Sequence, residues 1–173
     1  MFPLKSFHAL FIQGKKMKWY LFLLLIISSL NAFAIDFPQS PHAQITPGSL
    51  CDTPTEYRYP EHINYCERDV SSDLKNAIFE DYRKRIGYTL SIRNRADYKI
   101  DHFIPLCAGG SNKQNNLWPQ HVTVFNTTDP MESLGCEKLK LGRITQKDLV
   151  ALIRLAKLNL QEVPRVLQRL RSL

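Results

Sequence analysis

The sequence predicts a single α+β domain, and three observations support this fold class. Two short apolar stretches, residues 97–106 and 116–120, flank a loop rich in glycine. The last third of the chain repeats apolar residues at helical spacing. Four cysteines, an even number, are typical of a small domain held by disulfides. A chain of 173 residues with 44% hydrophobic side chains leaves room for one ordinary core and excludes a disordered or fibrous protein.

The first 34 residues have the pattern of a secretory signal peptide. Lys18 precedes twelve uncharged residues, 19–30, and Asn31-Ala32-Phe33-Ala34 supplies a small-x-small cleavage site. The run is short for a membrane span, which needs about 20 apolar residues. We expect cleavage after Ala34, with Met17 as an alternative start, export to the periplasm or the medium, and no stable membrane association afterwards. An uncleaved anchor is the alternative.

Net charge points weakly to an anionic partner. The chain has 23 basic and 16 acidic side chains, a net charge of +7. Residues 1–34 hold four lysines and no acid, so the remaining 139 residues carry only +3. Basic residues gather in two patches, which could follow a phosphate backbone or could be solvated helix faces. The second patch begins at Lys138; the first contains Arg83, Lys84, Arg85, Arg93, Arg95 and Lys99, and we expect Arg93, Arg95 and Lys99 to contact substrate.

The cysteines suggest two disulfides. All four follow residue 34, and an oxidising compartment favours their pairing. Of the three connectivities we favour Cys51 with Cys66, which closes a local loop, and Cys107 with Cys136, which joins two motif-bearing segments. A zinc site is the alternative, although no two cysteines have the short spacing typical of zinc ligands.

Before the motif, the chain predicts an arm, a loop and a helix. Residues 35–50 contain three prolines and no apolar period, so we expect an extended arm outside the core, followed by one domain over 51–173. We expect residues 51–66 to form a loop closed by a disulfide between Cys51 and Cys66. A helix capped by Ser71 or Ser72 should then run to Gly87, and its apolar residues are Leu74, Ile78 and Tyr82.

Strands should follow this helix. Residues 88–91 could form a short strand, and 97–106 alternates well enough to be another, with Tyr98, Ile100 and Ile104 on one face. The glycine-rich turn that begins at Ala108 leads to a third stretch, 116–120. The last two strands should therefore form a hairpin with a long loop.

The carboxy-terminal third should hold three helices. Asp129-Pro130-Met131-Glu132 has an N-cap, a proline at the first helical position and a glutamate at the third, so it predicts a helix start, with Gly142 as the end. A second helix should begin after Thr145, and Pro164 should begin a short third one. The buried stripe of the second helix is Leu149, Leu152, Ile153 and Ala156.

The residues suited to chemistry are concentrated in 99–121. Asp101 and His102 end an apolar strand, and they offer an oxygen ligand for a hard cation and a base that titrates near neutrality. Phosphodiester hydrolysis needs both a cation and a base. By themselves, the two residues could also be an ordinary strand-end pair. Trp118 is most simply part of the core, with stacking on a base as the alternative.

The runs DHFIPLCAGGSN and NNLWPQ together resemble the HNH endonuclease family. The resemblance is strong over 99–121, weaker to about Gly142 and absent elsewhere. It implies a ββα-metal core, a hairpin followed by a helix, within mostly helical surroundings. It also implies that Asp101 binds one divalent metal ion, that His102 is the general base, and that Asn116 hydrogen-bonds the imidazole. Magnesium or manganese is the expected ion, with zinc as an alternative.

The third metal ligand departs from the family pattern, because no histidine lies at the usual place after the second strand. By offset Asn126 is one candidate. A helix start similar to that of some exported relatives makes Glu132 the first choice, and His121 is the third. Glu132 and Asp129 also have a purely structural interpretation as a capping box.

Two function classes follow. The first is an exported nuclease that cleaves DNA, or RNA, with little sequence preference, for nutrition, defence or attack. The second is a secreted binding or structural module that keeps the hairpin as a scaffold and binds no metal at Asp101. The expected partner of the nuclease is nucleic acid; no protein partner can be inferred from the sequence.

Overall fold

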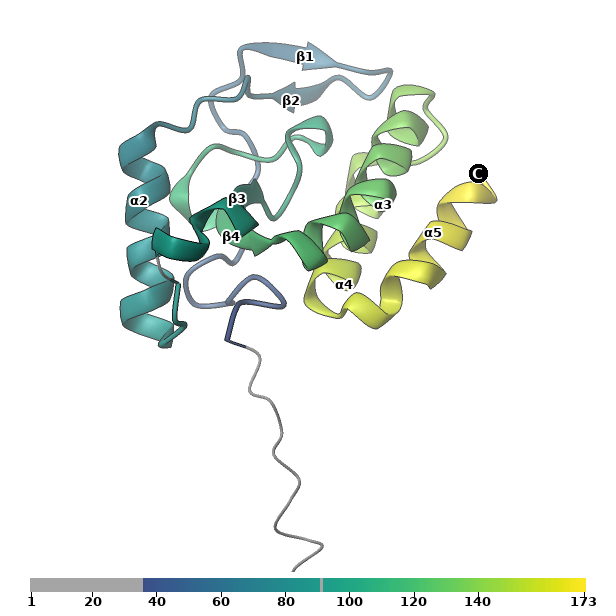
Figure 1. Ribbon diagram of the computed structural model, residues 1–173. Helices are drawn as coiled ribbons and strands as arrows, with labels where there is room; N and C mark the ends of the chain where they lie inside the picture. Colours follow the sequence, from purple (N-terminus) through teal and green to yellow (C-terminus); the bar gives the residue numbers. More distant parts are fainter. Residues whose placement is uncertain (1–35, 91) are drawn as a thin grey trace, which may run out of the picture. The chain divides into compact units, whose positions relative to one another are not determined.

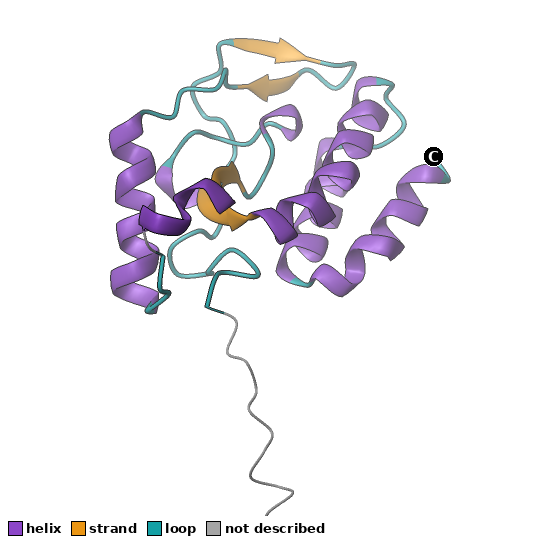
Figure 2. Ribbon diagram, in the orientation of Figure 1, coloured by secondary structure: helices purple, strands orange, loops and turns teal. Residues whose placement is uncertain are grey.

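Four helices and two small antiparallel hairpins form the part of the chain that the computed structural model describes, residues 36–90 and 92–173. This confirms the α+β class (Figure 2). The predicted signal peptide, with its alternative start at Met17, lies outside these residues. Among the helices that are described, none is long and apolar enough to cross a membrane. The helices are α2 (Ser72–Asp81), α3 (Val122–Lys140), α4 (Gln146–Leu158) and α5 (Val163–Arg171).

The predicted hairpin with a long loop is formed by β3 (Tyr98–His102) and β4 (Leu117–His121). Tyr98 pairs with His121 and His102 with Leu117, so all five residues of each strand are matched. β3 is shorter than the stretch 97–106, because the chain leaves the ladder after His102 and enters two short 3₁₀ turns. In β3, Tyr98, Ile100 and His102 are buried, whereas Lys99 and Asp101 alternate with them and are partly exposed.

Both ends of the helical segment that begins with α2 lie where the sequence predicts them. The Ser71 hydroxyl accepts a hydrogen bond from the Leu74 amide at 3.2 Å, and the chain continues from Tyr82 into a π-helical turn that ends at Gly87 with φ of 91°. Only glycine adopts that left-handed conformation readily. The strand predicted over 88–91 is not formed at residues 88–90, and Ser91 is outside the described part of the chain.

Two expectations for the amino-terminal side need correction. The arm lacks helices and strands over its described residues, but it is part of the core: Ile45 is buried, and the Thr46 hydroxyl donates to the Leu117 carbonyl at 3.0 Å. Residues 51–66, which were predicted to be a loop, contain a β-hairpin, with β1 (Glu56–Arg58) paired to β2 (Ile63–Tyr65). Its two positive-φ turn residues, Tyr59 and His62, gave no turn signal because neither is glycine or asparagine.

The start of α3 also differs from the prediction. The helix begins at Val122, and the His121 side chain accepts from the Thr123 amide at 3.3 Å. Asp129 and Pro130 therefore lie inside the helix, seven and eight residues after its start. A proline removes one backbone donor, but it does not stop a helix whose other face packs well. Asp129 and Glu132 are thus one helical turn apart and free of any capping role.

The later helices agree with the sequence. Thr145 caps α4, since its hydroxyl accepts from the Asp148 amide at 3.1 Å. Leu149, Ile153 and Ala156 are buried as predicted, whereas Leu152 is only partly buried. α3, α4 and α5 pack on one another, while α2 packs against β4 from the other side (Figure 1). Both predicted disulfides, Cys51–Cys66 and Cys107–Cys136, are formed, and each spans 5.7 Å between Cα atoms. The second joins the loop between β3 and β4 to α3.

Candidate functional site

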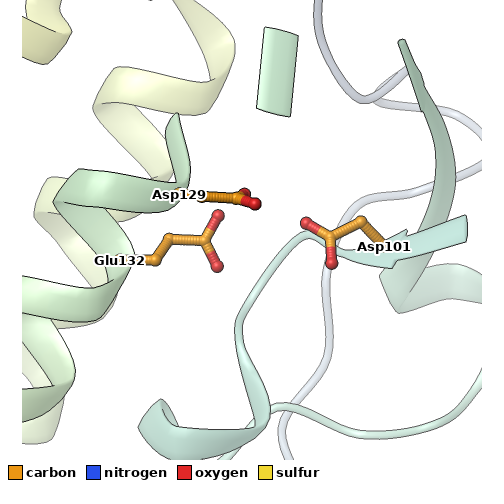
Figure 3. Close-up of side chains that lie close together, drawn as sticks. All are labelled: Asp101, Asp129 and Glu132. Atoms are coloured by element: carbon orange, nitrogen blue, oxygen red, sulfur yellow. The ribbon is translucent and has the colours of Figure 1, made fainter. Parts of the chain in front are cut away.

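Three carboxylates converge between β3 and α3. Asp101 projects from the hairpin, and Asp129 and Glu132 project toward it from α3 (Figure 3). One oxygen from each lies within 4.8 Å of the others. Asp101 and Glu132 are nearly enclosed, with side chains 15% and 14% exposed, whereas Asp129 is 45% exposed. The structure therefore brings Asp101 and Glu132 together, although they are 31 residues apart in the sequence.

Two lysines enter the carboxylate cluster. Lys157 from α4 is fully buried, and its Nζ lies 2.8 Å from Glu132 Oε1, 3.3 Å from Asp101 Oδ2 and 2.5 Å from the His102 carbonyl oxygen. Lys99 lies at the open side, where its ammonium donates to both Asp129 oxygens at 2.8 Å. When all five groups are ionised, three negative charges face two positive ones. In that state the cluster has one negative charge in excess.

Burial sets the protonation of the carboxylate cluster. Burial, reinforced by the charge of Asp101, raises the pKa of Glu132 to about 7, although Lys157 opposes the shift. For Asp101, burial would raise the pKa, but Lys157 and Lys99 outweigh it and hold the pKa below its ordinary value. The pKa of Lys157 is raised, because Glu132 and Asp101 outweigh the effect of its burial. Asp101 is thus the more acidic of the two carboxyl groups, and the pKa of Glu132 is the one shifted toward neutrality.

His102 lies at the end of β3 and is only 3% exposed. Its Nε2 is 3.0 Å from Asn112 Oδ1, and its Nδ1 is 3.2 Å from Nη1 of Arg68. Burial lowers the pKa of His102 to about 4, and Arg68 and Lys157 act in the same direction. The imidazole is therefore neutral at neutral pH. A neutral imidazole is the form that can accept a proton.

In the described part of the chain, Asn116 does not form the expected hydrogen bond with the His102 imidazole. Asn116 is fully buried, and its amide donates to the carbonyls of Ile104 and Ser111 and accepts from the amide of Ile104 at 2.9 Å. Asn116 therefore orders the loop between the two strands. The amide that contacts the imidazole is that of Asn112, in the turn of the same loop, so the side chain that orients His102 is Asn112 rather than Asn116.

The other two ligand candidates do not join the carboxylate cluster. His121 stacks on Phe37, with ring centroids 3.9 Å apart, and its Nδ1 is 2.9 Å from the Thr123 hydroxyl. Asn126 is exposed one turn before Asp129, and within the described chain no hydrogen bond joins it to the three carboxylates. Of the three candidates, the structure brings only Glu132 to Asp101.

The expected substrate contacts are largely engaged within the protein. Lys99 is paired with Asp129, as described above. Arg95 lies over the Phe79 ring, 3.8 Å from its centroid, and donates to the Tyr98 carbonyl at 3.5 Å. The side chain of Arg93 lies outside the described part of the structure. None of these contacts shows a basic surface directed at a substrate.

Sequence reasoning missed Asp129, Lys157, Arg68 and Asn112 as members of the site. Asp129 looked like a helix cap, and Lys157 looked like one of many basic residues in the carboxy-terminal helices. One signal for Lys157 was available, since it follows Ile153 by four residues and so lies on the buried stripe of α4. A lysine on an apolar helix face predicts a buried counter-charge. Arg68 lies 34 residues before His102, and nothing local links them.

Comparisons with protein-family models, with curated proteins and with solved structures find no match for this chain. The chemistry of its own residues therefore carries the inference about function.

Proposed function

We propose that this protein is an exported, metal-dependent endonuclease of the ββα-metal type, which hydrolyses phosphodiester bonds of DNA, or of RNA, with low sequence specificity. The observation that carries the proposal is the meeting of Asp101 and Glu132, the two metal ligands that the sequence ranks first, together with Asp129. The order of strand, strand and helix in β3, β4 and α3 is compatible with such a core. Two disulfides support export to an oxidising compartment.

The donor set suits a hard divalent cation. Asp101, Asp129 and Glu132 offer only oxygen, which favours magnesium or manganese over zinc. When Glu132 is ionised, the excess of negative charge in the carboxylate cluster favours cation binding as well. Once bound, the ion would supply charge stabilisation for the phosphoryl oxygens and the leaving oxygen.

His102 is the proposed general base. Its neutral imidazole takes a proton from water, the water oxygen forms a bond to phosphorus, and the ester P–O bond on the opposite side breaks. The leaving oxygen then takes a proton from solvent. The base and the ligand are neighbours in β3, and the hydrogen bond from Lys157 to the His102 carbonyl fixes the backbone at the end of this strand.

Cleavage of supercoiled plasmid tests this proposal. The full chain, produced in an oxidising compartment, should nick plasmid with magnesium or manganese and should be inactive with chelator. His102→Ala should lower the rate roughly 10²- to 10⁴-fold, the usual contribution of a general base. His62→Ala, at an exposed histidine in the β1–β2 turn, is the matched control and should retain full activity. Cleavage by folded His102→Ala within a few-fold of the parent rate would remove His102 as the base.

A second candidate is a binding module that has no metal, and one observation favours it. The Lys157 ammonium already lies between Asp101 and Glu132, where it neutralises much of the charge that would attract a cation. In this case the carboxylate cluster would be a buried ion-pair network that orders α4 against β3. Such networks specify packing more than they stabilise it.

Calorimetric titration with manganese separates the two candidates. The nuclease predicts saturable binding that Asp101→Asn weakens, and it predicts tighter binding in Lys157→Met, where the competing ammonium is gone. The module predicts no binding by the parent protein. A cooperative thermal transition without manganese shows that each variant is folded. A higher melting temperature with manganese is a second measure of binding, because a bound cation stabilises the native state.

A further inference from the structure

Both ring nitrogens of His102 have a hydrogen-bond partner, and together the partners define the tautomer. Arg68 offers only donors, so the Nδ1 atom that lies 3.2 Å from its Nη1 must be the acceptor. A neutral imidazole has one acceptor nitrogen and one N–H. Nε2 therefore carries the hydrogen and donates it to Asn112 Oδ1 at 3.0 Å.

The orientation of Asn112 agrees with this assignment. Its Nδ2 donates to the backbone carbonyl of Glu67 at 2.6 Å, and that oxygen can only accept. The amide oxygen of Asn112 is consequently the atom that faces the imidazole. Two independent partners thus leave Nδ1 as the single basic atom of His102, and Arg68 covers it.

Arg68 has the properties of an anion-binding residue. It is exposed and lies between β2 and α2, in a segment without regular structure, where Nη2 donates to the Ile100 carbonyl at 3.0 Å. Within the described part of the chain it forms no ion pair with a carboxylate. An exposed guanidinium without a counter-charge is suited to a phosphate, which it can bind through two parallel hydrogen bonds.

We propose that Arg68 is a positioning residue that covers Nδ1 of His102 in the free protein and moves to a backbone phosphate of bound nucleic acid, which uncovers Nδ1 for water. This inference rests on the proposed nuclease function, and it adds that the base becomes accessible only when substrate is bound. A phosphate outcompetes the imidazole for Arg68, because an anionic acceptor forms a stronger hydrogen bond with a guanidinium than a neutral one does.

Nitrogen-15 NMR of histidine-labelled full chain tests the cover directly. Without metal, the parent protein should show Nδ1 of His102 without a hydrogen, in a hydrogen bond. Addition of a short single-stranded DNA with chelator should move this resonance toward the position of a free acceptor nitrogen. Arg68→Ala should show the free position before DNA is added. A hydrogen on Nδ1, or the same Nδ1 resonance in the parent and in Arg68→Ala, would overturn the proposal.

Kinetics supply a second measurement. With manganese, Arg68→Ala should raise KM about tenfold or more, as expected for a lost charge-assisted hydrogen bond, and should leave kcat within about threefold. Arg165→Ala is the matched control, since Arg165 is also exposed but pairs with Glu162 at 2.6 Å. An unchanged KM in folded Arg68→Ala, or an equal rise in Arg165→Ala, would refute the role. If the parent protein cleaves nothing, the proposed function fails, whereas the NMR result still decides whether Arg68 covers Nδ1.

Discussion

Glu132 shows how a single residue takes its chemistry from its surroundings. A glutamate on a helix surface is an ordinary carboxylate, but here it lies beside Asp101 and a fully buried lysine. Burial and the neighbouring negative charge raise its pKa to about 7. The pKa of the residue that the sequence ranks as a metal ligand is therefore well above that of an ordinary glutamate.

This raised pKa predicts a pH dependence of metal binding. Below pH 7 a cation must displace a proton from Glu132, so binding releases protons and weakens as the pH falls. We expect manganese affinity to rise between about pH 6 and about pH 8 and then level off. Calorimetry in two buffers of different ionisation enthalpy measures both the affinity and the protons released.

Glu132→Gln is the control for this prediction, since the amide keeps the shape of the side chain and cannot ionise. It should bind manganese more weakly, with little change over the same pH range. A parent protein whose affinity is constant across that range would show that Glu132 is not the group displaced.

Among the elements, the loop between β3 and β4 does most to position the site. Asn116 ties the loop to Ile104 and Ser111, and Asn112 reaches His102 from its turn. The chain at Gly110 passes so close to Ile104 that a Cβ on Gly110 would overlap the Ile104 carbonyl oxygen and lie 2.7 Å from its carbonyl carbon. Glycine is required at this position by contact with the protein backbone and not by a positive φ.

Gly110→Ala should therefore disturb both the loop and the imidazole. We expect a loss of roughly 1–3 kcal/mol or more in the free energy of unfolding, because the backbone of Ile104 must shift to admit a methyl group. Plasmid cleavage should fall with it as Asn112 moves away from His102. Urea unfolding and the cleavage rate measure the two effects.

Gly87→Ala separates the stability effect from the loop effect. An added Cβ at Gly87 meets nothing within 4 Å, but the φ of 91° makes the alanine strained, at a cost of about 1–2 kcal/mol. It should lose stability and keep its cleavage rate. Equal activity in the two variants would show that the loop does not position the base.

At the scale of the whole molecule, the two disulfides hold together segments that contribute to the site. Cys51–Cys66 lies next to Glu67 and Arg68, which contact Asn112 and His102 respectively. Cys107–Cys136 joins the loop between β3 and β4 to α3, the helix that carries Asp129 and Glu132. Each bond therefore restrains a different side of the site.

Removing each disulfide in turn should destabilise the protein by an amount that follows loop length. Cys51 and Cys66 are 15 residues apart, and Cys107 and Cys136 are 29 apart. The entropy of loop closure predicts losses of about 3 and about 3.5 kcal/mol for the paired serine variants. Urea unfolding of the two double variants measures them. Unfolding midpoints equal to that of the parent protein would show that the cysteines do not restrain the chain.

The sequence by itself determined the local features of this protein. Short-range patterns predicted a cap at Ser71 or Ser72, a cap at Thr145, the buried stripe of α4 and a hairpin of residues 97–106 with 116–120. The cysteine pairing was favoured because one bond closes a local loop and the other joins two motif-bearing segments, and the structure confirms both bonds. Resemblance to a known motif predicted Asp101 and Glu132 as ligands of one metal ion, and the structure brings these two side chains together.

Tertiary structure alone decided where α3 begins and which side chains surround the site. Asp129 has the local pattern of a helix cap, but α3 begins at Val122 and buries Val124 and Thr128 in its first two turns, and Asp129 lies close to Asp101. Lys157 and Arg68 reach β3 from segments that are 55 and 34 residues away from His102. Contacts at such separations depend on how elements pack, and packing is a property of the folded chain that no local pattern encodes.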